Sequence, residues 1–468
     1  MTDSVLENMR EWLAQHEDEL LEQYRKLLQF PSIESDPGPN APFGDANRQA
    51  LDYMLSLASD AGMQTKDIEG YCGYGEFGQG EKMVMTLGHL DVVPVGHGWK
   101  HEPFGAEIDD GYVFARGAVD DKGPTMAAFF AARALKECYP DLGCRFRAVF
   151  GCNEESGFKC VERYNETEEP PTFGVAPDSD WPLVHAEKGI ANLIVEAPLI
   201  QGDVELLEIT GGQRPNIVID SCTARVKVAD DARQHVADKI EDAWDRNVRT
   251  SWSGDVLTVE AIGKAAHGAR PYGGDSAAIR VLRHLREITP LPVQEEYESL
   301  FEIPQLQGEG IGIQGADEVS GALSCNLGII ETTDSHLRFT LNVRYPVTWK
   351  GEELKRRCEE KLAEIDKGYR LAEMTDSPSL YFPLDHPMVK AICEVYEAET
   401  GETKEPGVMG GGTYARAVPN TVSIGTGWAG DGQAHETDEK LKIEHLFKMS
   451  RIYAHILYRL VNLAEESP

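Results

Sequence analysis

Short apolar runs of strand length alternate with segments of helical period in the first part of the chain, and this alternation limits its fold more than any other feature. Lys82–Leu87 (KMVMTL) and Arg145–Phe150 (RFRAVF) have the length and composition of strands. Between them, the alanine-rich segment Pro124–Lys136 is predicted to be a helix, since proline is tolerated at the first helical position. Helices and strands that alternate in this way predict an α/β domain with a mainly parallel sheet.

The middle of the chain differs from the parts on either side. Strand-like alternation dominates from about residue 188 onward, for example in Thr258–Ile262 and Leu337–Val343. The helix–strand alternation then resumes toward the end of the chain. We therefore expect a discontinuous α/β domain of residues 1–187 and 377–468, interrupted by an inserted α+β domain of residues 188–376.

The charge balance argues against several kinds of partner. Lys and Arg number 45, Asp and Glu number 79, and the formal net charge is −34. Such a surface repels phosphate backbones and anionic lipid, so we expect neither a nucleic acid nor a membrane as a partner. The start of the chain has no basic region followed by an apolar core, and no apolar stretch has the length of a membrane span.

The cysteines point to a reducing compartment. There are nine, an odd number, and no pair is spaced as Cys-x-x-Cys. This pattern argues for reduced thiols and against a disulfide framework or a thiolate zinc site. We therefore expect a cytoplasmic protein.

Most of the acids and histidines that could carry chemistry lie in five short segments. These are Gly88–Asp91 (GHLD), Arg116–Pro124 (RGAVDDKGP), Asn153–Gly157 (NEESG), Ala176–Pro182 (APDSDWP) and Ala434–Glu439 (AHETDE). His89 and Asp91 are two residues apart, so on an extended backbone both can face one pocket at the carboxyl end of a strand. Open α/β sheets bind their ligands at that end.

Each segment alone also has a purely structural interpretation. His89 could be a core histidine, Asp120 and Asp121 could cap the helix that follows, and Glu154 and Glu155 could be a solvated pair. Taken together, two imidazoles and three carboxylates form a ligand set for two divalent ions with one bridging carboxylate. Two ions roughly 3.5–4 Å apart are an arrangement used for hydrolysis.

In this order and context, the five segments resemble those of the dinuclear zinc peptidase and deacylase family, which includes glutamate carboxypeptidase and acetylornithine deacetylase. The branch of PepV-type dipeptidases is most similar, since Phe30–Ile33 (FPSI), the Asp120–Gly123 turn and Gly410–Arg416 (GGGTYAR) also fit it. The resemblance extends over essentially the whole chain. It implies a mainly parallel-sheet metallopeptidase catalytic domain, with the inserted α+β domain as a lid.

The resemblance also implies which residues hold metal. The ligands would be His89, Asp120 and Asp178 for one ion, and Asp120, Glu155 and His435 for the other. Asp120 would bridge because it matches the family position after Arg-Gly-x-x, and Asp121 is the alternative for that role. The family often has a cis peptide after the bridging residue. The ions are expected to be zinc, and manganese or cobalt would also suit these ligands.

Three further residues would act in catalysis. By the resemblance, Glu154 is the general base, and Asp91 orients and polarises His89. His267, in Lys264–Gly268 (KAAHG), would stabilise the oxyanion. Because His267 lies on the insert, catalysis would require one domain to close over the other.

Substrate contacts are expected from a separate set of residues. This set comprises Asn216, Arg344 and the backbone amides of Gly411, Gly412 and Thr413. The planar guanidinium of Arg344 suits the carboxylate of a peptide substrate. Glycine allows the main chain to approach a ligand closely.

We therefore expect a metal-dependent dipeptidase that hydrolyses short peptides through a metal-bridged hydroxide. Two alternatives remain open: an N-acyl-amino-acid deacylase or desuccinylase with the same metals, and a non-catalytic binding protein. The large insert resembles the PepV lid, which supplies its histidine within one chain, so a monomer is expected.

Overall fold

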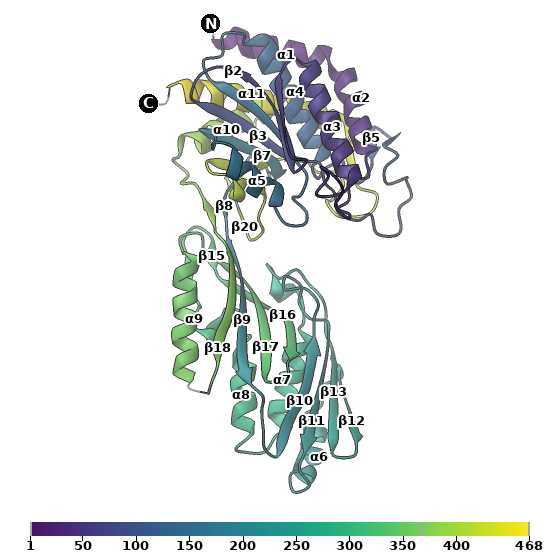
Figure 1. Cartoon of the computed structure of the whole chain (residues 1–468), viewed down its shortest axis with the longest axis vertical. Coiled ribbons are helices and arrows are strands. Elements are labelled where there is room, and N and C mark those ends of the chain that lie inside the picture. The colour runs from purple at the N-terminus through teal and green to yellow at the C-terminus, as the bar shows by residue number, and fades with distance from the viewer. Residues whose placement is uncertain (1, 366, 467–468) are drawn as a thin grey trace. The chain divides into compact units, whose positions relative to one another are not determined.

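The computed structural model describes residues 2–365 and 367–466, and the chain forms two compact units (Figure 1). Unit 1 comprises Met1–His185, Phe382–Gly407 and Gly412–Pro468, and unit 2 comprises Ala186–Tyr381 and Val408–Gly411. From the sequence, the first domain is expected to end at residue 187 and to resume at residue 377. In the structure, residues 408–411 also belong to unit 2.

A large mixed sheet has most of its strands in unit 1, while its residues 186–187, 380–381 and 408–409 belong to unit 2. Its strands are β1 (Gln64–Ile68), β2 (Cys72–Gly78), β3 (Met83–His89), β6 (Arg145–Gly151), β7 (Phe173–Ser179), β8 (Leu183–Glu187), β19 (Leu380–Tyr381), β20 (Gly407–Met409) and β21 (Thr421–Gly425). The strand order is β1-β2-β6-β3-β7-β21-β8-β19, and β20 pairs with β8. Neighbours within the group β6-β3-β7-β21 are parallel, and the pairs outside it that have a defined register are antiparallel.

Helices cover this sheet. They are α1 (Thr2–Gln15), α2 (Glu17–Leu28), α3 (Asp45–Asp60), α4 (Lys122–Cys138), α5 (Lys159–Thr167), α10 (Pro387–Thr400) and α11 (Ile443–Glu466), with a short 3₁₀ helix η3 (Tyr414–Ala417). The chain passes from β3 to β6 through α4 and from β6 to β7 through α5, and such crossovers are what parallel strands of one sheet require. The α/β class expected from the sequence is confirmed, and its parallel part is the four central strands.

The predicted alanine-rich helix is α4, and it is enclosed on several sides. It packs on β3 and contacts α1, α2 and α11. Every residue from Lys122 to Ala132 is buried. The small alanine side chains let the surrounding elements approach α4 closely.

Unit 2 is built on an antiparallel sheet of order β12-β13-β11-β10-β16-β17-β9-β18. Its strands are β9 (Gly189–Pro198), β10 (Val204–Gly211), β11 (Ser221–Val228), β12 (Val248–Ser253), β13 (Val256–Ile262), β16 (Ser324–Thr332), β17 (His336–Tyr345) and β18 (Arg370–Ser377). Its helices are α6 (Arg233–Asp242), α7 (Ala277–Ile288), α8 (Gln294–Glu302) and α9 (Gly351–Ile365), with 3₁₀ helices η1 (Pro271–Gly273) and η2 (Glu309–Ile311). Buried and partly buried residues alternate along β9, as expected when one face of an antiparallel sheet covers a core.

Two small sheets complete the structure. One pairs β14 (Ala316–Asp317) with β15 (Gly321–Ala322), and the other has the order β22-β5-β4, formed by Lys440–Lys442, Tyr112–Phe114 and Glu107–Asp109. Strand β22 pairs with β5 antiparallel, so that Lys440 lies opposite Phe114. This pairing brings the residues after β5 beside the residues before β22.

Three neighbouring parallel strands end beside predicted ligands. Strand β3 ends at His89, β6 ends at Gly151 just before the turn with Glu154 and Glu155, and β7 contains Asp178. The carboxyl ends of parallel strands meet at one edge of a sheet, where open α/β folds place their ligands. The fold of unit 1 therefore gathers residues that are far apart in the sequence.

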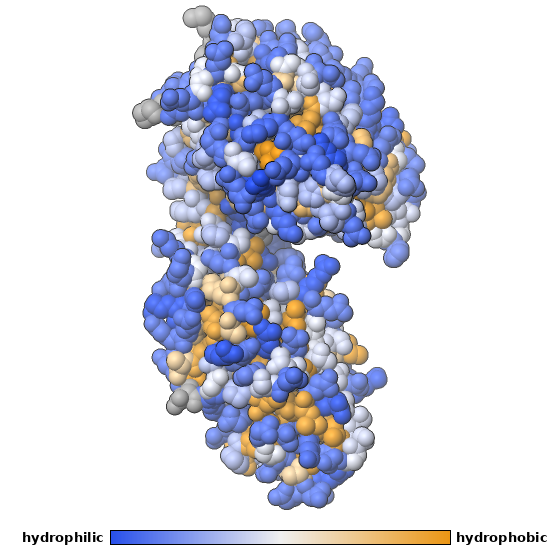
Figure 2. Space-filling view, in the orientation of Figure 1, coloured by the Kyte–Doolittle hydropathy of each residue, from blue (hydrophilic) through white to orange (hydrophobic). Residues whose placement is uncertain are grey.

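None of the helices described by the structure is both long and apolar enough to span a membrane. On the face shown in Figure 2, most residues are hydrophilic and apolar residues lie among them.

Candidate metal centre

His89 is the most enclosed of the predicted ligands, with a relative exposure of 1%. Its Nε2 lies 3.0 Å from Oδ1 of Asp120, and its Nδ1 lies 2.9 Å from the backbone oxygen of Asp91. A contact to the second ring nitrogen fixes the orientation of an imidazole, as is usual for metal-binding histidines.

The carboxylate of Asp91 has a different set of partners from those expected. Its Oδ1 lies 3.6 Å from Nδ1 of His89, beyond hydrogen-bond distance. Its two oxygens accept hydrogen bonds from the backbone N–H groups of Glu154 and Glu155, both at 3.0 Å. The backbone of Asp91 thus holds the imidazole of His89, while its side chain holds the turn that carries the two glutamates.

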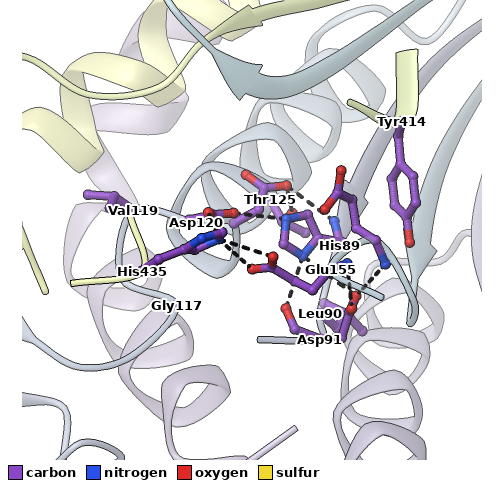
Figure 3. Close-up of polar contacts among 12 residues, drawn as sticks. His89, Leu90, Asp91, Gly117, Val119, Asp120, Thr125, Glu155, Tyr414 and His435 are labelled. Carbon is purple, nitrogen blue, oxygen red and sulfur yellow. Dashed lines mark hydrogen bonds and ion pairs between the residues drawn. The ribbon is translucent and has the colours of Figure 1, made fainter. Parts of the chain in front are cut away.

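Asp120 lies between the two histidines that were predicted to bind different ions (Figure 3). Its Oδ1 contacts His89, and its Oδ2 lies 3.1 Å from Nε2 of His435. The same nitrogen of His435 lies 3.0 Å from Oε2 of Glu155. The peptide between Asp120 and Asp121 is cis. A carboxylate with one oxygen toward each imidazole has the placement that a bridging ligand needs.

The remaining carboxylates converge on the same point. One ligand atom from each of His89, Glu154 and Asp178 lies within 4.8 Å of the others, and the same is true of His89, Asp120 and Glu155. With the contacts of His435, the structure brings all five predicted metal ligands and Glu154 together. Imidazole nitrogens and carboxylate oxygens are suitable donors for zinc and similar divalent ions, so this donor set fits the expected metals.

Asp121, the alternative bridge, is directed elsewhere. Its Oδ2 accepts hydrogen bonds from the backbone N–H of His89 at 3.2 Å and from Oγ1 of Thr125 at 2.9 Å. Among the described residues, it belongs to neither group of converging ligand atoms. The geometry therefore favours Asp120 for the bridge.

The pKa values in the metal-free site reflect burial and close charges. Burial raises the pKa of Glu154, and the nearby carboxylate of Asp178 raises it further. Burial opposes ionisation of Asp120, but its contacts with His435 and His89 outweigh burial and lower the pKa of Asp120. Contacts with Asp120 and then Glu155 raise the pKa of His435 to about 10. The carboxylates thus stabilise positive charge at the place where cations are expected.

Unit 2 contains four of the residues predicted to act on or bind the substrate: Asn216, His267, Arg344 and Gly411. The backbone oxygen of Asn216, whose side chain is exposed, accepts a hydrogen bond from Gly268 at 2.7 Å, so Asn216 lies next to the His267 loop. Burial lowers the pKa of His267, and the cations Arg344 and Arg270 lower it further. Both effects favour the neutral imidazole of His267, which has one N–H to donate.

Arg344 is buried and partly engaged within unit 2. Its Nε donates to Oδ1 of Asn342 at 3.1 Å, and its Nη1 donates to the backbone oxygen of Gly410 at 3.0 Å. The second contact ties the segment 408–411, which contains Gly411, to strand β17.

Gly412 and Thr413 lie in unit 1. A Cβ atom at Gly412 would lie 2.3 Å from Nη1 of Arg416, so a larger residue would displace that side chain. The hydroxyl of Thr413 accepts a hydrogen bond from the backbone N–H of Ala415 at 3.2 Å and caps η3. The role of these amides in substrate binding remains a prediction.

Tyr414 contacts the site in a way that the sequence analysis missed. Its ring packs edge-on against His89, with centroids 6.0 Å apart. Its hydroxyl accepts a hydrogen bond from the backbone N–H of Asn153 at 3.2 Å and lies 2.7 Å from Sγ of Cys160. No local pattern signals this contact, because Tyr414 and Asn153 are 261 residues apart.

Known proteins are similar to this chain over nearly its whole length. Residues 85–459 match Peptidase family M20/M25/M40. The "Putative dipeptidase YtjP" of Bacillus subtilis (strain 168) is 32% identical over 457 residues, which cover 95% of this chain and 97% of that protein. A similarly named protein of Staphylococcus epidermidis is 33% identical over 467 residues, which cover 96% of this chain and 99% of that protein.

Solved structures of low sequence identity share the fold. The di-peptidase Dug1p from Saccharomyces cerevisiae has a TM-score of 0.57 and 15% identity, with 100% of both chains covered. Human carnosine dipeptidase 1 has a TM-score of 0.55 and 15% identity, with 98% of this chain and 99% of that chain covered. The family match spans most of this chain and includes the converging ligands, and the relatives are similar from end to end. The chain therefore belongs to Peptidase family M20/M25/M40.

Proposed function

We propose that this protein is a dipeptidase that uses two divalent metal ions, with zinc as the expected metal. The observation that carries this proposal is Asp120, which directs one carboxylate oxygen toward His89 and the other toward His435. Membership in a metallopeptidase family implies divalent ions, and the names of the relatives suggest dipeptides as substrates.

Two triads would hold the ions. By the family resemblance, one triad would be His89, Asp120 and Asp178, and the other would be Asp120, Glu155 and His435; the convergence of these ligand atoms supports the proposal. When bound, such ions polarise a carbonyl and can lower the pKa of water from 15.7 to about 7. Asp91 would keep Glu154 and Glu155 in place through their backbone amides.

Glu154 would move the proton. Its carboxyl group lies with His89 and Asp178 but is not needed to complete either triad. It would take a proton from the attacking water and return it to the leaving amine. Burial raises the pKa of Glu154, which favours a carboxylate that readily accepts a proton.

Unit 2 would contribute the residues that recognise the substrate. We propose, from the family resemblance, that the N–H of His267 stabilises the oxyanion and that Arg344 binds the substrate carboxylate, with Asn216 and the amides of Gly411, Gly412 and Thr413 assisting. The cations near His267 support a neutral imidazole in this role. A lid function for unit 2, a monomeric state and a cytoplasmic location complete the proposal; free thiols at all nine cysteines support a reducing compartment.

Replacement of the proposed base tests the assignment. Glu154→Gln should retain two bound zinc ions and lower kcat for dipeptides by roughly 10²–10⁴-fold, the usual contribution of general acid–base catalysis. Glu162→Gln, on α5 of the same unit, is the control and should leave kcat unchanged. A Glu154→Gln enzyme with unchanged kcat would refute Glu154 as the base.

A substrate panel tests the activity itself. Parent protein loaded with zinc should hydrolyse dipeptides and leave N-acyl amino acids largely intact. Exclusive cleavage of N-acyl or N-succinyl amino acids would identify a deacylase with the same metal centre. No hydrolysis of either class by zinc-loaded protein would indicate a binding protein.

A further inference from the structure

A buried ion pair lies next to the metal centre and is not part of the predicted ligand set. Nη1 of Arg116 lies 2.8 Å from Oε2 of Glu439, and the two side chains are 2% and 0% exposed. The pairing of β22 with β5 brings these residues together, although they are 323 positions apart. A buried ion pair is costly to desolvate unless further hydrogen bonds satisfy its polar atoms, so the other partners of this pair are informative.

Glu439 organises the turn that carries Asp120. Its Oε1 accepts hydrogen bonds from the backbone N–H groups of Val119 at 2.8 Å and Asp120 at 3.3 Å. Its Oε2 accepts a hydrogen bond from the N–H of Gly117 at 3.1 Å. One carboxylate thus binds three amides of the turn that leads into Asp120.

Arg116 organises the turn that carries His435. Its Nη1 donates to the backbone oxygen of Glu436 at 3.0 Å, and its Nη2 lies 3.5 Å from the backbone oxygen of His435. Nη2 also lies 3.4 Å from the oxygens of both Pro94 and Val95, in the segment that follows His89. Of the polar side-chain atoms of Arg116 and Glu439, Nε of Arg116 is the one without a hydrogen-bond partner among the described residues.

The position of His435 depends on its backbone. Its side chain is 54% exposed, so apart from the contacts of Nε2 with Asp120 and Glu155 little packing fixes the imidazole. Its φ of 66° lies in the left-handed region, which costs energy for a residue with a Cβ and persists only where neighbouring groups hold it. The carbonyl contacts of Arg116 are on this residue and the next one.

We propose that Arg116 and Glu439 are positioning residues that set the distance between Asp120 and His435, and hence the affinity for the ion that these two ligands share. This inference rests on the two-ion site of the proposed function. The pair contacts the backbones of both ligands and not their metal-binding atoms. Its loss should weaken binding of the His435-bound ion most, because that ion depends on both turns, whereas the other ion keeps His89 and Asp178 and depends on the pair only through Asp120.

Conservative variants separate positioning from folding. Arg116→Lys keeps the charge but loses the planar fork that reaches several carbonyls. Glu439→Gln keeps the shape but loses the charge. Arg147→Lys is the matched control, since Arg147 is also 2% exposed and forms ion pairs in unit 1 with Glu76, Glu168 and Glu169.

The readout is zinc binding to metal-free protein, followed with a competing chelator. In Arg116→Lys and Glu439→Gln, the Kd of one zinc ion should rise about 10- to 100-fold, the usual effect of removing a group that supports a ligand. The Kd of the other ion should rise clearly less, because it shares only Asp120 with the disturbed turns, and Arg147→Lys should leave both Kd values unchanged. His435→Ala should raise the Kd of the same zinc ion. In the double variant, Arg116→Lys should raise that Kd little further.

Each outcome bears on a separate claim. If the parent binds only one zinc ion, the two-ion site fails and this inference fails with it. The other case is a parent protein that binds two ions as proposed. In that case, the positioning role alone is overturned if both folded variants keep each Kd within threefold of the parent, or if they raise the Kd of both ions equally. Circular dichroism of the metal-free variants establishes folding; if Arg116→Lys does not fold, Glu439→Gln decides. If neither folds while Arg147→Lys does, the pair serves stability and the inference is wrong.

Discussion

Asp91→Asn tests whether the Asp91 side chain holds the turn that carries Glu154 and Glu155. In the parent, each carboxylate oxygen accepts one backbone N–H at 3.0 Å. Asparagine has nearly the same shape but only one oxygen, so one N–H would face an NH₂ group. A hydrogen bond to a charged group contributes about 1.5–3 kcal/mol. Loss of one such bond should make local opening of the turn about 10- to 150-fold more frequent, because 1.4 kcal/mol corresponds to a factor of about ten.

Amide hydrogen exchange measures this opening directly. The metal-free protein is used, because bound ions would also restrain the glutamates. Exchange at Glu154 and Glu155 should accelerate by the factor above, while exchange in the centre of β3 stays unchanged.

Asp431→Asn is the matched control, because Asp431 also accepts two backbone N–H groups, from Trp428 at 2.8 Å and Lys442 at 2.9 Å. It should accelerate exchange at those two amides and leave Glu154 and Glu155 as in the parent. If Asp91→Asn leaves both glutamate amides fully protected, the side chain of Asp91 does not hold the turn.

Three further predictions concern metal, pH and packing. A chelator should abolish dipeptide hydrolysis and zinc should restore it; activity that survives complete metal removal, checked by elemental analysis, would contradict the metal-dependent mechanism. Burial opposes ionisation of Glu399, but contacts with His455 and Arg10 outweigh burial and lower the pKa of Glu399 from the ordinary 4.5. The contacts of the Glu399 carboxylate therefore stabilise the fold fully above pH 4.5, and this stabilisation is lost as the pH falls through the folded-state pKa. The Tm difference between parent and Glu399→Gln should therefore be largest near neutral pH and shrink below pH 4.5; a constant difference would contradict the assignment. In unit 2, a Cβ at Gly189 would lie 1.9 Å from Cζ of Tyr345, so Gly189→Ala should destabilise the protein by about 1–3 kcal/mol or more, and Tyr345→Ala in the same chain should relieve the clash. Strictly additive losses of Tm in that double variant would show that the clash is not the cause.

The sequence alone predicted features that have a local signature. Helical and strand periodicity indicated the α/β class, because the side chains that face a core must repeat with the period of their element. The strand-end segments containing His89, Glu154 and Asp178 could be selected because acids and histidines follow apolar runs there. The family resemblance then supplied roles for these residues and for His435.

Only the tertiary structure decided the contacts that hold the centre in place. The carboxylate of Asp91 binds amides 63 and 64 residues away, and Arg116 binds Glu439 from 323 residues away. The assignment of residues 408–411 to unit 2 was likewise not foreseen. Side-chain bonds to distant backbone groups leave no periodic pattern, because any residue can supply the amide or carbonyl. Such partners exist only once the chain has folded.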